Sequence, residues 1–351
     1  MKEIIDPAYT DEVKGEAASQ SREAALSAPA GAANDSAKNA DHSELRKNVF
    51  ELLADEEGIF ESSLAELLAE DSFDSGPASL LIPIRAAGSK PPLFCIHPAG
   101  GQVMVYHHLS NALGSDQPFY GLQSRALDDS SLEHGSIEEM AAEYADAIRQ
   151  QQAEGPYHLM GWSMGGVIAV NIAHHLERQG QQVAFVGLID SFLFDDASGE
   201  EDPLADLALA FGGVLADAFD SLDAQSQQAI QGELLSLSPE QRVIRVMQWA
   251  RERGLLPADL SPEIFQEQVK LSAIHTRLLR GHRAPTINAP LKVWWAEGNQ
   301  APRTDWGKHT LGEFSARALT GNHFTLLYPP YCEALARGIE ESLEAAHRSS
   351  L

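Results

Sequence analysis

One serine of the chain stands in a setting that could make it a nucleophile. Glycines lie two residues before and two residues after it, in Gly161-Trp162-Ser163-Met164-Gly165. The residues before Ser163 alternate as in a strand, and the apolar residues after it recur at helical spacing, so the serine falls at a strand-to-helix turn. The pattern also occurs by chance in ordinary turns, but between a strand and a helix it is typical of a nucleophile elbow, which lifts the hydroxyl above a sheet. It predicts acyl transfer through a serine.

A serine hydroxyl is a poor nucleophile at neutral pH, so it needs a base within hydrogen-bond reach and a carboxylate that orients the base. Asp190 ends the first strand-like run after Ser163, and His323 lies in the loop directly after the last such run. The order serine, aspartate, histidine is the order that a fold with a nucleophile elbow uses. We therefore predict Ser163 as the nucleophile, His323 as the base and Asp190 as the acid that orients it.

Other residues compete for these roles. Asp305 and Glu297 follow the strand-like run 291–296 and are alternatives for the acid, but we favour Asp190 because the acid must reach the base. His309 lies in a polar loop and is the alternative base. Four further histidines lie in or near helical patterns and are expected to be surface or packing residues: His107, His108, His174 and His175.

An oxyanion hole needs two backbone N–H groups aimed at the oxygen that becomes negative. The first is expected from Met164, the residue after the nucleophile. The second is expected from the loop at 97–101, which follows an apolar strand-like run and contains two glycines that let a substrate approach. We predict that Ala99 supplies this N–H, and that His97 fixes the loop and does not act as a base.

Strands and helices alternate from Leu80 onwards. Strand-like runs at 93–97, 119–122, 157–162 and 183–189 are separated by helical patterns at 106–113, 137–148 and 167–176. The strand pattern returns at 291–296 and at about 314–319, and a closing helix is expected from 331 to about 346. Such alternation predicts an α/β fold with a mostly parallel central sheet and helices on both faces.

The alternation stops for about a hundred residues after Asp190. Apolar residues at helical spacing recur between 204 and 280, and no strand is evident there. We expect an all-helical lid at about 195–285 over the edge of the sheet where the strands end. The alternative is a helical subdomain that only adds stability.

The first 79 residues differ from the rest. Residues 1–42 are expected to be a disordered segment and linker, because from about residue 15 they are rich in Ala, Ser, Asn and Gln and almost lack large apolar residues. Residues 43–79 predict a short amphipathic helical element, which either packs on the main body or docks on another protein. The main domain is expected at 80–351.

Composition excludes several classes of partner. The chain carries 25 Lys and Arg against 51 Asp and Glu, a formal net charge of −26, so we expect no nucleic acid as a partner. Two cysteines, Cys95 and Cys332, make a disulfide framework improbable and favour a reducing cytosol. No apolar run approaches the ~18 residues of a membrane span, and the N-terminus lacks a secretory pattern, so a cytoplasmic protein without a membrane anchor is expected.

Five stretches, in the right order, resemble one known family. They are residues 92–101, 117–123, 155–166, 188–191 and 321–327. They are similar to the α/β-hydrolase thioesterase domains, called type I, that end non-ribosomal peptide and polyketide synthetases. The resemblance implies that Ser163 is acylated, that His323 and Asp190 complete the triad, and that the helical insertion is a lid. It also implies no cofactor, since the substrate arrives on the phosphopantetheine arm of a carrier protein.

The region before the main domain departs from that family, in which a carrier domain precedes the thioesterase. Asp71-Ser72-Phe73 is weakly similar to the carrier serine motif, but the few residues before Leu81 leave no room for two further carrier helices. We therefore expect a free-standing enzyme that meets an acyl or peptidyl carrier protein in trans, with residues 43–79 as a candidate docking element. The expected reaction is hydrolytic release of the chain in secondary-metabolite biosynthesis. The alternatives are acyl transfer or cyclisation onto an amine or hydroxyl, and a non-catalytic carrier-binding subunit.

Overall fold

The computed structural model describes residues 80–127, 129–194, 222–253, 262–299 and 302–350. The predictions for 1–42 and 43–79, including the docking element, lie outside the described residues. So does the first part of the expected lid, at 195–221. None of the described helices is both long and apolar enough to cross a membrane.

A seven-stranded sheet forms the centre of the main domain, in the order β1-β3-β2-β4-β5-β6-β7. All neighbouring strands pair in parallel except β1 and β3, which are antiparallel. The prediction of a mostly parallel sheet is confirmed. The strands are β1 (Leu81–Arg85), β2 (Leu93–Ile96), β3 (Phe119–Leu122), β4 (Tyr157–Trp162), β5 (Val183–Ile189), β6 (Leu291–Ala296) and β7 (Phe314–Leu319).

The edge strand β1 was not among the predicted strands. Pro83 interrupts its short run of apolar residues, and a proline cannot donate a hydrogen bond to a sheet ladder. An edge strand tolerates this loss because it has a neighbour on one side only.

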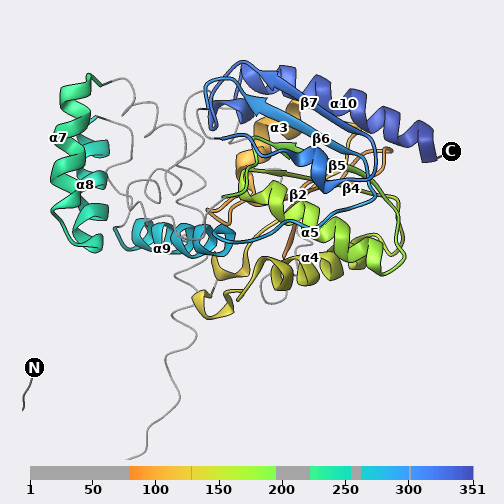
Figure 1. Cartoon of the computed structure of the whole chain (residues 1–351), viewed down its shortest axis with the longest axis horizontal. Helices are drawn as coiled ribbons and strands as arrows, with labels where there is room; N and C mark the ends of the chain where they lie inside the picture. The colour runs from red at the N-terminus through yellow and green to blue at the C-terminus, as the bar shows by residue number, and fades with distance from the viewer. Residues whose placement is uncertain (1–79, 128, 195–221, 254–261, 300–301, 351) are drawn as a thin grey trace, which may run out of the picture. The chain divides into compact units, whose positions relative to one another are not determined.

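Helices cover both faces of the sheet (Figure 1). Helices α4 and α5 lie together on one face, and α3 and α10 lie together on the other, each pair over its own cluster of buried apolar side chains. The helices are α3 (His107–Ala112), α4 (Ile137–Gln151), α5 (Met164–Arg178), α7 (Ala224–Leu235), α8 (Pro239–Glu252), α9 (Pro262–Leu279) and α10 (Tyr331–Ser350). Short 3-10 turns lie at Met104–Tyr106, Arg125–Leu127, Ser130–Leu132, Trp306–His309 and Thr325–Leu327.

The described part of the insertion between β5 and β6 consists of α7, α8 and α9, and those residues contain no strand. Capping explains where two of these helices begin. Asp223 accepts a hydrogen bond from the Ser226 N–H, and Ser238 forms a capping box with Gln241 ahead of Pro239. Helix α9 packs on α8 and also contacts α5, so it connects the insertion to the main body (Figure 1). The role of the insertion as a lid stays a prediction.

Candidate active site

Ser163 lies between the end of β4 and the start of α5, as predicted. Its backbone has φ 56° and ψ −125°, a strained conformation for a residue with a β-carbon. The turn is so tight that a β-carbon on Gly161 would lie 2.0 Å from the carbonyl carbon of Gly165. A β-carbon on Gly165 would lie 2.2 Å from the carbonyl oxygen of Ile96 in β2. Both glycines are therefore required for the serine to stand at this edge of the sheet.

Asp190 lies beside Ser163 because of the register of the sheet. Trp162 in β4 pairs with Ile189 in β5, so the next residue of each strand, Ser163 and Asp190, emerges at the same edge. Asp190 is fully buried and has φ 44°. Among the described residues, Ser163 and Asp190 are the two non-glycine residues with positive φ. Strain of this kind is characteristic of functional positions.

His323 is bonded to Asp190. Its Nδ1 lies 2.7 Å from Asp190 Oδ2, and because a carboxylate only accepts, Nδ1 carries a proton; in the neutral imidazole the lone pair is then on Nε2. Nε2 is buried and has no hydrogen-bond partner among the described residues, so it is free to accept a proton. The indole N–H of Trp162 donates to the His323 carbonyl at 2.8 Å, which fixes the loop beside the end of β4.

The acid has a further partner that the sequence analysis missed. The side-chain amide of Asn299 donates to Asp190 Oδ2 at 2.6 Å, and the Ala296 N–H donates to Oδ1 at 2.9 Å. Both come from the end of β6 and the turn after it. Three donors therefore hold the carboxylate in one orientation toward the histidine. The signal in the sequence that could have pointed to Asn299 is its place three residues after the strand-like run 291–296.

The competing residues lie elsewhere. Asp305 is exposed and paired with Lys308 at 3.1 Å, and Glu297 is exposed and accepts from the Thr320 hydroxyl at 3.3 Å. His309 Nδ1 donates to the Ala284 carbonyl at 3.0 Å. The four histidines that were expected to be surface or packing residues have their own contacts: His107 with Asn111, His108 with Tyr328, His174 with the Thr286 carbonyl and His175 with Gln179. None of these contacts is with Asp190.

The two predicted oxyanion donors lie at the ends of neighbouring strands. Met164 is the first residue of α5, where a backbone N–H has no partner within the helix, and Ala99 lies three residues after β2. Tyr106 connects the two regions, because its hydroxyl donates to the Ile96 carbonyl at 2.6 Å and accepts from the Trp162 N–H at 2.8 Å. The end of β2 is thereby fixed against the end of the nucleophile strand.

His97 holds the loop, as predicted. Its Nδ1 donates to the Pro98 carbonyl at 2.7 Å, which leaves Nε2 to accept from the Tyr144 hydroxyl at 2.6 Å. Burial is the main cause that lowers the pKa of His97 to about 3, and the neighbouring His275 adds to it. Burial likewise lowers the pKa of His275 to about 4. Both rings are therefore neutral at pH 7.

We predict that His97 and His275 cause the free energy of unfolding to fall in mild acid. In the unfolded chain each titrates near its usual pKa of about 6.5, so below that pH the unfolded state binds more protons than the folded state. The free energy of unfolding should begin to fall near pH 6.5 and continue to fall until about pH 4 for His275 and about pH 3 for His97. At pH 5 the expected loss is roughly 2 kcal/mol for each histidine.

Urea denaturation at pH 7 and pH 5 measures this loss, and His275→Asn provides the comparison. The variant lacks one of the two titrating groups, so its loss between the two pH values should be smaller by roughly 2 kcal/mol. An equal loss in the variant and the native protein would show that His275 does not contribute.

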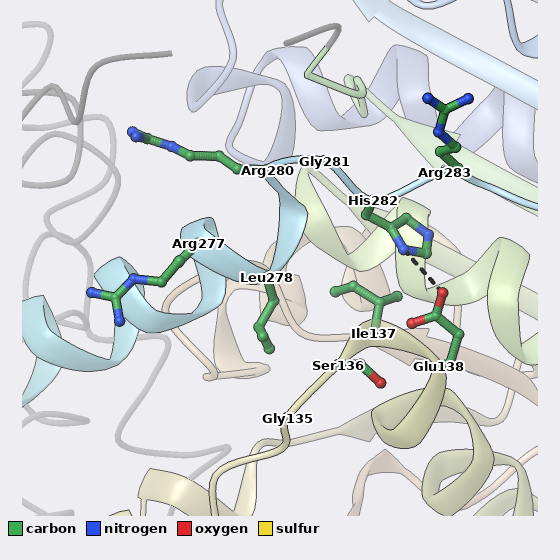
Figure 2. Close-up of a pocket in the computed structure, with 10 residues that line it drawn as sticks. All are labelled: Gly135, Ser136, Ile137, Glu138, Arg277, Leu278, Arg280, Gly281, His282 and Arg283. Atoms are coloured by element: carbon green, nitrogen blue, oxygen red, sulfur yellow. Dashed lines mark ion pairs between the residues drawn. The ribbon is translucent and has the colours of Figure 1, made fainter. Parts of the chain in front are cut away.

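The pocket in Figure 2 lies apart from these residues. It has a volume of about 460 Å³, lies between the N-terminus of α4 and the C-terminal end of α9, and includes none of Ser163, Asp190 and His323. The side chains of Arg277 and Arg283 point away from each other and do not converge on one point. Within the part of the chain that the structure describes, no cluster of His, Cys, Asp or Glu is arranged to hold a metal ion.

Comparisons with known proteins place this arrangement in a family. A family model described as a thioesterase domain matches residues 91–343. The chain is 47% identical over 122 residues to the malpinin synthetase of Mortierella alpina, covering 35% of this chain and 2% of that protein. It is 37% identical over 175 residues to a dimodular nonribosomal peptide synthase of Bacillus subtilis (strain 168), covering 48% of this chain and 7% of that protein. The chain thus spans only a small part of the length of these relatives.

Solved structures agree with this result. A holo four-domain nonribosomal peptide synthetase bound to AMP and glycine superposes with a TM-score of 0.65 at 26% identity, over 79% of this chain and 21% of that one. The NocB thioesterase domain, in covalent complex with a fluorophosphonate nocardicin G analogue, has the same fold at 20% identity, with a TM-score of 0.55 over 75% of this chain and 99% of that one. The family model covers more than half of the chain, and so the chain belongs to the thioesterase domain family and is a hydrolase-type enzyme with an α/β-hydrolase fold.

Proposed function

We propose that this enzyme releases an acyl or peptidyl chain from the phosphopantetheine thioester of a carrier protein, through an acyl-enzyme on Ser163, in secondary-metabolite biosynthesis. The observation that carries the proposal is the 2.7 Å contact of His323 Nδ1 with Asp190 Oδ2, at the edge of the sheet where Ser163 begins α5. The relatives that match parts of the chain are synthetases, which supports a substrate built by such a system.

In the first half of the proposed reaction, Ser163 Oγ attacks the thioester carbonyl carbon and His323 Nε2 takes the hydroxyl proton. Asp190 stabilises the imidazolium that forms. The N–H groups of Ala99 and Met164 are proposed to bind the oxyanion, with the positive end of α5 behind Met164. Collapse of the intermediate breaks the C–S bond, and the proton on His323 goes to the departing thiol of the phosphopantetheine arm.

In the second half, a water molecule takes the place of the thiol. His323 Nε2 accepts a proton from this water as it attacks the Ser163 ester, and returns the proton to Ser163 Oγ when the free acid leaves. An amine or hydroxyl in place of water would give an amide, an ester or a ring by the same route.

The carrier protein is the proposed partner, and its phosphopantetheine arm stands in place of a separate cofactor. Delivery in trans and docking through residues 43–79 depend on a segment outside the described residues and stay predictions. The thiol that leaves is then the free arm of the carrier, ready to be loaded again.

Thioesters of N-acetylcysteamine, which imitate the end of the phosphopantetheine arm, test the proposal. The full chain should release N-acetylcysteamine thiol from a panel of acyl and peptidyl thioesters, and a fluorophosphonate should label the peptide that contains Ser163. Product analysis separates free acid from a ring or amide. Failure of both thiol release and labelling would refute the proposal and favour a carrier-binding subunit without catalysis.

A further inference from the structure

Helix α9 reaches across to the loop that is proposed to supply one oxyanion donor. His275 Nδ1 lies 2.6 Å from the Ala99 carbonyl oxygen, and the side-chain amide of Gln268 donates to the Gly100 carbonyl at 2.5 Å. The side-chain amide of Gln102 donates back to Gln268 Oε1 at 2.9 Å. The two α9 side chains thus bind consecutive carbonyl groups of one loop, although they lie 176 and 168 residues away from those carbonyls in the sequence.

The loop approaches α9 closely at two glycines, where an added β-carbon would displace a side chain of the helix. A β-carbon on Gly100 would lie 2.9 Å from Gln268 Nε2. A β-carbon on Gly101, which has φ 81°, would lie 2.9 Å from Leu271 Cδ2. The α9 residues that face the loop follow the spacing of one helix face, at 268, 271, 272 and 275. Helix α9 and the loop at 97–101 therefore pack closely against each other.

Hydrogen bonds to the carbonyls of Pro98 and Ala99 determine the orientation of the Ala99 N–H. A peptide group is planar, so the direction of the Pro98 carbonyl sets the opposite direction of the Ala99 N–H. His97 holds the Pro98 carbonyl, and His275 holds the next one, that of Ala99. The peptide planes on both sides of the Ala99 α-carbon are thereby fixed. One of the two is held from the main body and the other from α9.

The two histidine rings support each other. They stack with centroids 5.1 Å apart and planes inclined by 23°, and both are buried. Because a carbonyl only accepts, His275 must carry its proton on Nδ1 to make the bond to Ala99. A neutral ring with this tautomer is the form that the buried site favours.

The C-terminal end of α9 is anchored to the main body. His282 follows the helix, and its Nε2 accepts from the Asn171 amide of α5 at 3.0 Å. Its Nδ1 faces Glu138 Oε1 of α4 at 3.4 Å (Figure 2). Two helices of the main body therefore hold the base of α9, and this determines where His275 and Gln268 meet the loop.

We propose that α9 positions the oxyanion hole, with His275 as the positioning residue that acts through the Ala99 carbonyl. The inference rests on the proposed function of the Ala99 N–H. It makes the chemistry at Ser163 dependent on the position of α9. Side chains bind the carbonyls of Pro98, Ala99 and Gly100, and the loop loses the last two of these three hydrogen bonds when the helix moves away. An N–H that is turned or mobile stabilises the oxyanion less well, which slows the chemical step and leaves substrate binding nearly unchanged.

Two variants at His275 test the hydrogen bond. His275→Leu removes the donor and is expected to lower kcat on an N-acetylcysteamine thioester by about 10- to 100-fold, with KM changed less than about 3-fold. His275→Asn keeps an N–H near the position of Nδ1 and should return kcat to within about 5-fold of the native value. Phosphonylation by a fluorophosphonate also places negative charge on an oxygen, so its rate should follow the same order.

Ser272→Ala is the matched control. Ser272 lies on the same face of α9, is fully buried, and its hydroxyl has no partner among the described residues, so kcat should not change. Gln268→Met removes the donor to Gly100 and should lower kcat by about 3- to 10-fold; it carries the test if His275→Leu does not fold.

Three results would overturn the inference. The first is a native kcat in His275→Leu, or in Gln268→Met where that variant replaces it. The second is a loss of kcat in His275→Asn as large as that in His275→Leu, and the third is a loss as large in the control Ser272→Ala. Failure of the proposed function looks different. In that case the native protein itself would neither release thiol nor react with the fluorophosphonate.

Discussion

Replacement of Ser163 by alanine is expected to abolish the acyl-enzyme and to lower kcat on thioesters by about 10⁴-fold or more. The variant loses the single atom that attacks the substrate. It keeps the β-carbon and the backbone hydrogen bond from its N–H to the Ile189 carbonyl, at 2.9 Å. Alanine and serine tolerate a positive φ about equally, so the melting temperature should stay close to the native value.

Intact mass spectrometry after incubation with a thioester measures the adduct directly. Ser191→Ala is a suitable control, because Ser191 is buried one residue after Asp190 and its hydroxyl donates to the Ile189 carbonyl. This control should still form the adduct. An acyl adduct on the Ser163→Ala protein would show that another residue is the nucleophile.

Replacement of Asp190 by asparagine should lower kcat by about 10³- to 10⁴-fold. Asp190 Oδ2 accepts hydrogen bonds from His323 and from Asn299, and Oδ1 accepts from the Ala296 N–H. A side-chain amide has only one acceptor oxygen and cannot serve all three donors. The imidazole then loses the partner that keeps its proton on Nδ1, and Nε2 no longer presents a lone pair to the serine.

Asp305→Asn makes the comparison quantitative. Asp305 is exposed and pairs with Lys308, so its loss should change kcat less than about 3-fold. Thiol release by the two variants under the same conditions decides the acid. A large loss in Asp305→Asn together with a small loss in Asp190→Asn would assign the acid to the region after β6.

The sequence predicts the position of Ser163 well because all the signals are local. Strand alternation, a glycine on each side and a helical pattern occur within about twenty residues, and the turn they predict is present. The choice between Asp190 and the acids after β6 is different in kind. Asp190, Glu297 and Asp305 each end or follow a strand, so the local sequence pattern alone does not identify which of them is the acid of the triad. The register of β4 with β5 and the positive φ at Asp190 bring this carboxylate to His323, and neither property is visible in a short stretch of sequence.

Other features depend on contacts between distant segments. Asn299 is an ordinary turn residue in the sequence, and only the pairing of β5 with β6 brings it to Asp190. His275 was not among the predicted site residues and lies within the helical pattern between 204 and 280. Its bond to Ala99 spans 176 residues. The hydrophobic pattern identifies the helix, but not the peptide group that one of its side chains binds.

The fit between α9 and the loop at 97–101 limits how the insertion can be exchanged between related enzymes. An obvious chimera would replace everything between β5 and β6 as one module. Such a graft would bring a foreign residue to position 275 while keeping the resident Ala99, and so break the hydrogen bond that spans the junction. A recombination site just before α9, near residue 262, keeps the helix with its own loop. The loop and α9 are then inherited together, whatever segment replaces α7 and α8.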